Sequence, residues 1–342
     1  MRIAQIMLAK RFGGAERSFV DISRALVARG HEVLAICQPG SQAAEKLRTA
    51  GVHCQPVRCF GSWDLLAKHT IKRRLASFNP ELVHCHLARA SHLGGAAAHS
   101  LGIPTVAKTH NLVQLKYYRH IDHLVPTTSA QVNHLERAGI DPARITRIPN
   151  FTVVTGRAPT ANGAPPFRIA ALGRYVRKKG FDLLIDAAWQ LQADGIEFRV
   201  DIAGDGPERR PLEAQIQARG LSDCVRLNGW CDDAGEFLND ADLLVVPSRA
   251  EPFGIVVIEA MALKVPVLAT RTQGPIEILD DACGYLCETD DHATLASAIQ
   301  SALHDPQRVD KVASAWRRYN SLYSESAVVS AYEMLYGQLI KP

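Results

Sequence analysis

The sequence predicts an α/β fold built from two doubly wound parallel-sheet domains. The chain has 342 residues, about twice the ~150 of a typical domain. Short apolar runs alternate with stretches of helical periodicity, which is the pattern of a parallel sheet with right-handed crossovers. The alternation is interrupted at 150–167 by a segment rich in Pro, Gly, Thr and Ala. We interpret this segment as the linker between the two domains.

The first half opens with a strand, a glycine turn and a helix. The apolar run 2–8 is the expected strand, and Phe19, Ile22 and Leu26 repeat at helical spacing until Gly30 ends the helix. The same unit then recurs. Further strands are expected at 31–37, 81–86, 103–109 and 122–128.

The second half repeats this organisation after the linker. Strands are expected at 167–173, 197–204, 224–229, 241–248 and 265–270, and the final helices at about 291–304, 306–318 and 325–340. The last helix is amphipathic and long enough to return to the first domain. We therefore assign residues 1–150, with the returning helix at about 325–342, to an N-terminal domain and residues 151–324 to a C-terminal domain.

Charge divides unevenly between the halves. Residues 1–150 contain 20 Lys and Arg against 9 Asp and Glu, whereas the remainder contains 19 against 26, so +11 and −7 give the formal net charge of +4. A basic first half suggests an anionic partner such as a phospholipid surface or a phosphorylated acceptor. A solvated basic face is the alternative. No nucleic-acid partner is expected.

The composition also indicates a compartment. The sequence shows no basic-plus-apolar leader and no apolar run of about 18 residues, and its eight cysteines form no CxxC pair. Free thiols in a reducing cytoplasm are the simplest interpretation. His84, Cys85 and His86 alternate along one strand, so neighbouring side chains point to opposite faces, which argues against a zinc site.

Ligands of open α/β sheets bind beyond the carboxyl ends of strands and against helix N-termini. In the first half, these positions hold Gly13 and Gly14, whose backbone lets a phosphate approach, and the histidines 84, 86 and 110. In the second half, they hold Gly173, Arg174, Lys179 and Gly180, then Gly204 to Gly206, Ser248 to Glu251, and the stretch 272–277.

Arg174 and Lys179 together predict an anion site suited to a diphosphate. Arginine supplies a planar fork for phosphate oxygens and lysine a point charge, and both lie beside a glycine-associated strand end. Plain surface positions are the alternative for both residues.

The stretch "EPFGIVVIEA" at 251–260 places two acids around an apolar run that we expect to be a helix over Phe253 to Ala262. Glu251 precedes the helix, where a carboxylate can accept from sugar hydroxyls. Glu259 lies just over two turns later and has apolar neighbours, which favours an inward position over a surface one. Phe253, Gly254 and Ile255 would offer helix N-terminal amides to an anion between the acids.

Several of these stretches resemble one family in order and spacing. They are "GGAER", "LVHCH", "THN", "RIPN", "LGRYVRKKGFDLLIDAA", "IAGDGP", "ADLLVVPSRAEPFGIVVIEAMALKVPVLAT" and "QGPIEIL". Together they resemble the family 4 glycosyltransferases, retaining enzymes of the GT-B fold, over about residues 1–280, and "AYEMLY" resembles the family's terminal crossover helix. Many members of the family have two glycines before a Pro-Glu pair, whereas this chain reads Gln273-Gly274-Pro275-Ile276-Glu277. This variant resembles the lipopolysaccharide-core branch, so the contacts of this loop with the donor remain open.

The resemblance implies a UDP- or GDP-linked sugar donor on the C-terminal domain and a glycan or glycolipid acceptor on the N-terminal one. By position, Arg174 and Lys179 would bind the diphosphate, helped by Gly173 and Gly204, and Glu259 would bind the ribose. Glu251 and the backbone of Phe253, Gly254 and Ile255 would hold the transferred sugar. His110 would lie beside the anomeric carbon, and Gly13 and Gly14 would border the phosphate and the acceptor. His84 would either contact a ligand or only pack within the protein.

No cofactor or metal is expected. The departing diphosphate gathers negative charge that Arg174, Lys179 and the helix amides can stabilise, and retention without an obvious nucleophile implies attack on the same face. Asp240 and Asp242 imitate an Asp-any-Asp metal motif, but they lead into "LLVVPS" and so lie at the wrong end of the strand.

The segment 63–78 pairs apolar residues with basic ones. Trp63, Leu66, Ile71, Leu75 and Phe78 lie near Lys68, Lys72, Arg73 and Arg74. This pattern predicts either a helix on an anionic membrane, peripheral to its cytoplasmic face, or an ordinary surface helix.

Two other classes of protein share the predicted features. A nucleotide-sugar epimerase uses two such domains, and a non-catalytic sugar-nucleotide-binding protein would retain a relic site. The sugar, the nucleobase and the acceptor depend on loops such as 111–120 and 55–62, which carry no readable signal.

Overall fold

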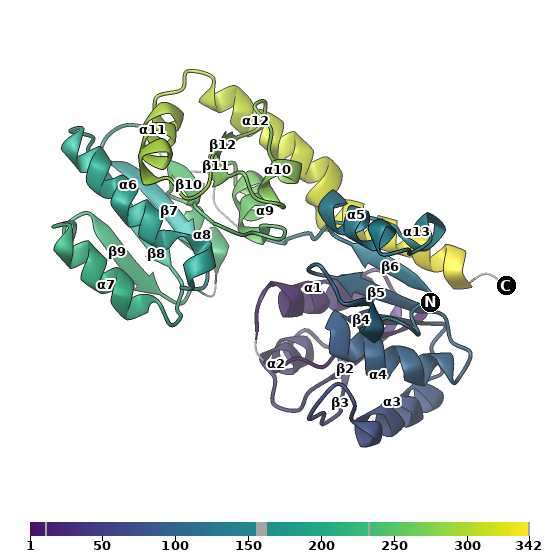
Figure 1. The fold of residues 1–342 in the computed structure, drawn as a ribbon. Helices are drawn as coiled ribbons and strands as arrows, with labels where there is room; N and C mark the ends of the chain where they lie inside the picture. Colours follow the sequence, from purple (N-terminus) through teal and green to yellow (C-terminus); the bar gives the residue numbers. More distant parts are fainter. Residues whose placement is uncertain (11, 155–162, 232, 341–342) are drawn as a thin grey trace. The chain divides into compact units, whose positions relative to one another are not determined.

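The computed structural model describes residues 1–10, 12–154, 163–231 and 233–340. The chain divides into two compact units, which we call unit 1 (1–151 and 325–342) and unit 2 (152–324). Each unit is a sheet with helices on both faces (Figure 1). Most of the predicted linker, 155–162, lies outside the described residues.

The sheet of unit 1 has six parallel strands in the order β3-β2-β1-β4-β5-β6. The strands are β1 (Arg2–Met7), β2 (Glu32–Cys37), β3 (His53–Pro56), β4 (Leu82–His86), β5 (Thr105–Thr109) and β6 (His123–Pro126). The apolar runs predicted five of them to within one or two residues at each end. The edge strand β3 was missed, because its sequence HCQP contains no apolar run and it is only partly buried.

Helices cover both faces of this sheet. They are α1 (Gly14–Ala28), α2 (Gln42–Thr49), α3 (Leu65–Phe78), α4 (Leu87–His99), α5 (Ser129–Arg137) and α13 (Glu325–Ile340), with short 3-10 turns η1 (Leu115–Tyr117) and η2 (Pro142–Arg144). One core layer lies under α1, α2 and α13, and the other under α3 and α4. Parallel strands buried on both faces explain why the strands read as continuous apolar runs.

The last helix, α13, belongs to unit 1 although it follows all of unit 2 (Figure 1). Val328, Val329, Tyr332, Leu335 and Tyr336 are buried in the core layer of α1 and α2. The terminal helix thus forms part of the core of unit 1.

The sheet of unit 2 also has six parallel strands, in the order β12-β11-β10-β7-β8-β9. The strands are β7 (Phe167–Leu172), β8 (Phe198–Ala203), β9 (Val225–Gly229), β10 (Leu243–Val246), β11 (Val267–Thr270) and β12 (Tyr285–Cys287). The three-residue edge strand β12 was missed, since it is too short to form a pattern.

The helices of unit 2 divide between the two faces in the same way. They are α6 (Phe181–Ala193), α7 (Arg209–Ala218), α8 (Ala234–Leu238), α9 (Ile255–Ala262), α10 (Pro275–Ile278), α11 (His292–Leu303) and α12 (Arg308–Arg318), with a 3-10 turn η3 (Arg177–Lys179) and a π-helical turn η4 (Tyr319–Tyr323). Helices α6, α7 and α11 cover one core layer, and α8, α9 and α10 the other.

Both sheets have the same topology. Numbered within its own unit, each follows the order 3-2-1-4-5-6, so the direction of winding reverses between β1 and β4 and again between β7 and β10. A crevice opens at the carboxyl ends of the strands at such a switch point. The loops after β7 and β10 in unit 2, and after β1 and β4 in unit 1, are therefore the places where a ligand is expected.

Gly180 brings the loop after β7 against the end of β10. Its φ is +68°, and a Cβ there would lie 1.9 Å from the carbonyl oxygen of Pro247. Gly195 has a similar φ of +75° but open space around it. The two glycines therefore separate the cost of a left-handed backbone from the cost of the close approach.

We expect Gly180→Ala to destabilise unit 2 far more than Gly195→Ala. The left-handed conformation costs about 1 kcal/mol in both variants, and the clash with Pro247 adds about 2 kcal/mol or more at position 180 only. Urea unfolding of the two variants measures the difference. Equal losses would contradict the close approach of the two loops.

Candidate active site

Lys179 and Glu251 meet at the switch point of unit 2. Lys179 ends the η3 turn after β7, Glu251 lies on the loop after β10, and the Lys179 Nζ donates to Glu251 Oε2. The side chains are 19% and 9% exposed, so the pair is shielded from solvent yet reachable. A Cβ on Gly173 would lie 3.4 Å from Lys179 Cε, which places the end of β7 against the lysine stem. Three residues predicted for one site thus lie together.

Arg249 fixes the loop that carries Glu251. Its guanidinium donates two hydrogen bonds of 2.7 Å to the carboxylate of Asp182 in α6 and also binds Asp290. Its backbone N–H donates to the carbonyl of Lys178, at 2.8 Å. Burial would raise the pKa of Asp182, but the hydrogen bonds and charge of Arg249 outweigh it and hold that pKa below its usual value. The loop and the lysine turn are therefore clamped together.

Helix α9 begins at Ile255, two residues later than the predicted Phe253. Gly254 precedes it with a φ of 94°, a conformation that disfavours any residue with a Cβ and ends the regular helix there. The Phe253 ring is buried against Tyr323, so this side chain is not available to a ligand. The Val257 N–H donates to the Gly254 carbonyl at 2.9 Å, and the N–H groups before it lie at the helix start, where an anion can bind.

The remaining predicted residues of unit 2 differ in exposure. Glu259 is 2% exposed within α9, which confirms the inward position expected from its apolar neighbours. Arg174 is exposed, and its guanidinium has no hydrogen-bond or ion-pair partner within the described residues. Gly204 packs tightly, because a Cβ there would lie 1.9 Å from the Gly173 carbonyl oxygen. The close packing of the two loops therefore explains why position 204 is a glycine, even without a ligand.

The loop after β11 joins this site. The N–H of Gly274 donates to the Glu251 carbonyl at 2.9 Å, and a Cβ on Gly274 would lie 1.9 Å from the Phe253 carbonyl oxygen. The variant sequence 273–277, whose contacts the sequence left open, therefore packs on the loop of the first acid.

In unit 1 the predicted histidines form one column of rings. His84 and His86 in β4 stack with centroids 4.4 Å apart, and His86 stacks on His110, after β5, at 5.7 Å. His84 and His86 are fully buried, whereas His110 is partly exposed. The Nε2 of His110 is buried and has no hydrogen-bond partner within the part of the chain that the structure describes. This nitrogen is a hydrogen-bonding group that the described part of the protein leaves unpaired.

Lys108 lies behind the column and was not singled out from the sequence. Its Nζ is fully buried and donates to Tyr332 Oη at 2.7 Å and to the carbonyls of Ile148 and Pro149. Burial without a carboxylate lowers the pKa of Lys108 to about 7. Burial first, and the charge of Lys108 second, hold the pKa of His110 well below its usual value.

The glycine turn after β1 already holds an acid. Glu16, in the first turn of α1, accepts from its own N–H and from that of Gly13. Burial raises the pKa of Glu16 above its usual value despite these bonds. Gly13 and Gly14 are exposed, but part of the N–H set predicted for a phosphate is occupied by this carboxylate.

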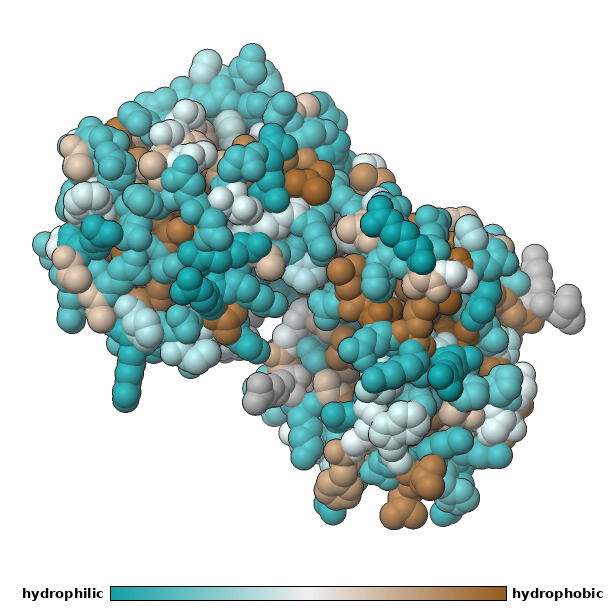
Figure 2. Space-filling model, in the orientation of Figure 1, coloured by the Kyte–Doolittle hydropathy of each residue, from teal (hydrophilic) through white to brown (hydrophobic). Residues whose placement is uncertain are grey.

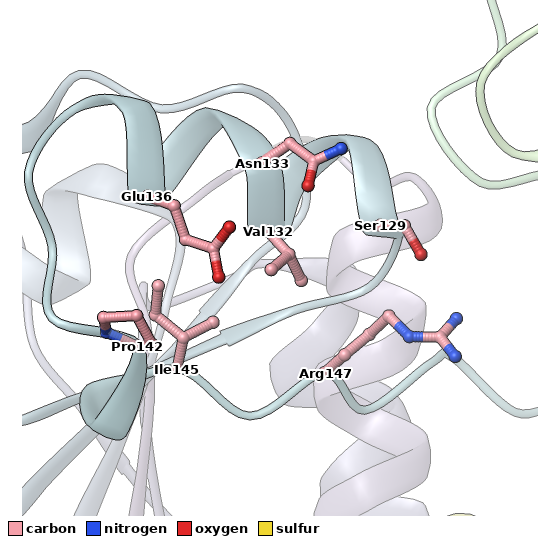
Figure 3. A pocket seen from close by; sticks show the side chains of 7 residues that line it. All are labelled: Ser129, Val132, Asn133, Glu136, Pro142, Ile145 and Arg147. Atoms are coloured by element: carbon pink, nitrogen blue, oxygen red, sulfur yellow. The ribbon is translucent and has the colours of Figure 1, made fainter.

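A separate shallow pocket of about 350 Å³ runs along α5 (Figure 3). Side chains of α5 face those of the segment 142–147 across it. Its lining residues are Ser129, Val132, Asn133, Glu136, Pro142, Ile145 and Arg147. None of the predicted site residues lines it, so we do not place the reaction there.

Sequence comparison now decides the family. Residues 12–155 match the family described as Glycosyltransferase Family 4, and residues 157–320 match Glycosyl transferases group 1. The lipopolysaccharide core biosynthesis glycosyltransferase LpsD of Rhizobium meliloti is 30% identical over 334 residues, which cover 95% of each chain. The chain belongs to the family 4 glycosyltransferases. LpsE of the same organism is 30% identical over 344 residues, covering 94% of this glycosyltransferase and 95% of LpsE.

Solved structures agree on the fold of this glycosyltransferase. Anabaena Alr3699/HepE in complex with UDP aligns with a TM-score of 0.88 at 20% identity, over 99% of this chain and 100% of that one. The apo form of the lipopolysaccharide outer core galactosyltransferase WaaB aligns at 0.80 with 16% identity, over 99% and 100%. The predicted GT-B fold is confirmed. The comparisons give no support to the epimerase alternative.

The Asp-any-Asp stretch has a structural role in this glycosyltransferase. Asp242 precedes β10, at the amino end of the strand, and accepts from the N–H groups of Gly163 and Arg168 at 3.1 and 2.9 Å. Asp240 pairs with the Arg168 side chain at 3.1 Å. The prediction that both acids lie at the wrong strand end is confirmed.

The histidine column makes unit 1 sensitive to acid. His84, His86 and His110 are held neutral in the fold chiefly by burial, whereas in the unfolded chain each takes up a proton near pH 6.5. Below that pH the unfolded chain binds more protons, so stability falls by up to about 1.4 kcal/mol per pH unit for each histidine.

We expect His86→Gln to reduce the pH dependence of the free energy of unfolding by about 1.4 kcal/mol per pH unit between pH 6 and 5. Urea unfolding of wild type and variant at pH 7, 6 and 5 measures it. His69→Gln is the control, because the exposed ring of His69 is solvated in both states. A pH dependence that is unchanged in His86→Gln would show that the column titrates in the fold.

Proposed function

We propose that this glycosyltransferase transfers a sugar, with retention at the anomeric carbon, from a UDP-sugar to a glycan or glycolipid acceptor of the cell envelope, such as lipopolysaccharide core. The contact of Lys179 with Glu251 at the switch point of unit 2 is the observation that carries this proposal. The names of LpsD and LpsE support the acceptor class. The UDP in the Anabaena structure supports uridine over guanosine.

Unit 2 would hold the donor. The diphosphate would lie between Arg174, Lys179 and the N–H groups at the start of α9, with Glu259 on the ribose. The ammonium of Lys179 neutralises Glu251 in the ion pair. When a diphosphate attracts Lys179, the Glu251 carboxylate becomes available to accept from hydroxyls of the transferred sugar. Binding of the phosphate and of the sugar would thus be linked through one ion pair.

The reaction would proceed without a metal. Cleavage of the bond between the anomeric carbon and the diphosphate leaves negative charge on the phosphate, which two cations and the α9 amides can stabilise before it forms. The acceptor would attack from the face that the phosphate leaves, and the departing phosphate would take the acceptor proton. Unit 1, with its basic excess, would bind the acceptor, and His110 would lie beside the anomeric carbon.

The donor is tested first by thermal shift with UDP-, GDP- and ADP-sugars, of which a UDP-sugar should raise the melting temperature most. Transfer is then assayed as UDP release, which should require acceptor and persist in EDTA. Isomerised donor without acceptor, or rescue of a chelated enzyme by magnesium, would contradict the mechanism. The anomeric configuration of the product, by NMR, tests retention.

Lys179→Met should lower kcat roughly 10² to 10³-fold, the usual loss for one preorganised donor to a developing anion. Lys178→Met is a matched control, because Lys178 is the exposed neighbour in the same η3 turn and should leave kcat within about twofold. Similar losses in both variants would assign the effect to the turn and not to the Lys179 ammonium.

We further propose that the enzyme docks on the cytoplasmic face of an anionic membrane through a tip of unit 1 that is formed by the loop before α3 and the first two residues of α3. Ile71, Leu75 and Phe78, predicted to face the membrane, are instead buried in the core, so that part of the hypothesis is wrong. Four other apolar side chains are exposed by 71% or more: Phe60, Trp63, Leu65 and Leu66. Apolar patches interrupt the largely hydrophilic surface of unit 1 in Figure 2, including toward the end that carries α3.

Basic residues support the docking of this tip on an anionic membrane. In the sequence, Arg58 precedes the apolar tip and Lys68, Arg73 and Arg74 follow it, and each cation near an anionic surface contributes about 1 kcal/mol. Within the described residues, no helix has the length and hydropathy needed to cross a bilayer. Binding would therefore combine shallow insertion of the tip with charge attraction.

Leu65→Ser with Leu66→Ser should weaken co-sedimentation with anionic vesicles at least about tenfold, because two leucines no longer enter the lipid. Val309→Ser with Leu322→Ser, at exposed apolar positions of unit 2, is the control. Binding should also weaken with salt. Equal binding of wild type to neutral and anionic vesicles would count against the proposal.

A further inference from the structure

A hydrogen-bonded chain joins the last helix to the histidine column. Tyr336 Oη of α13 lies 2.7 Å from His84 Nδ1, and Gln5 Nε2 of β1 lies 3.4 Å from the same nitrogen. Gln5 Oε1 lies 2.8 Å from His86 Nε2. His86 stacks on His110 and meets the edge of Phe19 at 5.3 Å. The chain therefore runs from α13 through two strands to the partly exposed ring beside the proposed reaction.

These contacts set the proton of one ring and bias that of another. The carbonyl oxygen of Gln5 can only accept, so the neutral His86 carries its proton on Nε2. At His84 the short contact is with the Tyr336 hydroxyl, which donates when Nδ1 is bare, and the Gln5 amide at 3.4 Å can only donate and adds a weaker preference for that state. Gln5 thus selects the tautomer of His86, and Tyr336 contributes most of the preference at His84.

A second set of contacts supports the column from behind. Register places Lys108 beside His86, and the Lys108 amine binds Tyr332, one turn before Tyr336 on α13. The Tyr332 ring lies 5.3 Å from that of His84. The positive charge of Lys108 helps to keep all three histidines neutral, after burial itself.

This polar cluster is not needed for packing. Burying an amine, three imidazoles and two hydroxyls costs free energy that hydrogen bonds only partly recover, whereas apolar side chains of similar size would stabilise the same layer. The cluster is fully buried except at His110, whose ring is partly exposed. The hydrogen bonds and ring contacts of this cluster therefore act on the His110 ring.

We propose that Gln5 and Tyr336, with Lys108 and Tyr332 behind them, are positioning residues that hold the ring of His110 in one orientation for sugar transfer. The inference rests on the proposed role of His110. Helix α13 then does more than complete the hydrophobic core of unit 1, because it supplies the hydroxyls of Tyr332 and Tyr336 to the histidine column.

The test is a two-bond ¹H–¹⁵N NMR spectrum of the full chain labelled at histidine, which reports the tautomer and protonation of each ring. His110 is assigned from His110→Gln. In Tyr336→Phe, we expect His84 to populate the other tautomer, and the resonances of His86 and His110 to shift. Tyr118→Phe, at a buried tyrosine of the opposite core layer, should leave all three rings unchanged.

A second variant tests the set behind the column. Lys108→Met keeps the length of the side chain and removes a positive charge that lowers the pKa of the histidines, so His110 should titrate at higher pH than in wild type. If His110 is unmoved in both variants, or moves equally in Tyr118→Phe, the inference is overturned. Its failure leaves the transfer assay untouched, whereas an active His110→Gln enzyme would refute the role of His110 itself.

Discussion

Parallel pairing at the two switch points is the constraint on which the molecule depends. Because β7 pairs with β10, and β1 with β4, the carboxyl ends of these strands share one edge in each sheet. Residues 72 positions apart, Lys179 and Glu251, meet for this reason. The supporting contacts of Arg249, Gly180 and Gly274 hold backbone against backbone, so the charged pair is fixed by loops that have little room to move.

The sequence predicts the fold well because its signals are local. Buried parallel strands read as apolar runs, and only the short edge strands β3 and β12 lack one. Site residues at strand ends could be found from topology alone. Arg249, Gln5 and Tyr336 could not, since nothing local distinguishes an arginine that clamps a loop or a tyrosine that bonds across a core. Lys108 left one readable trace, a lysine inside the apolar strand VAKT.

The two units use charge in opposite ways. Unit 2 pairs several of its charges with a nearby opposite one, as in the Arg249–Asp182 and Lys179–Glu251 contacts, so these groups stabilise the loops that they join. Unit 1 buries an amine and three imidazoles with no acid between them. Such a cluster holds its rings by hydrogen bonds and stacking alone, which makes it rigid in shape but dependent on remaining neutral.

The return of α13 to unit 1 sets the order in which a nascent chain can mature. Its five buried side chains contribute on the order of 10 kcal/mol, comparable to the whole stability of a typical domain. Unit 2 is complete once residue 324 has left the ribosome, while unit 1, although it is begun first, waits for α13. The amino-terminal core must therefore remain open, or be shielded by chaperones, throughout synthesis of the rest of the enzyme.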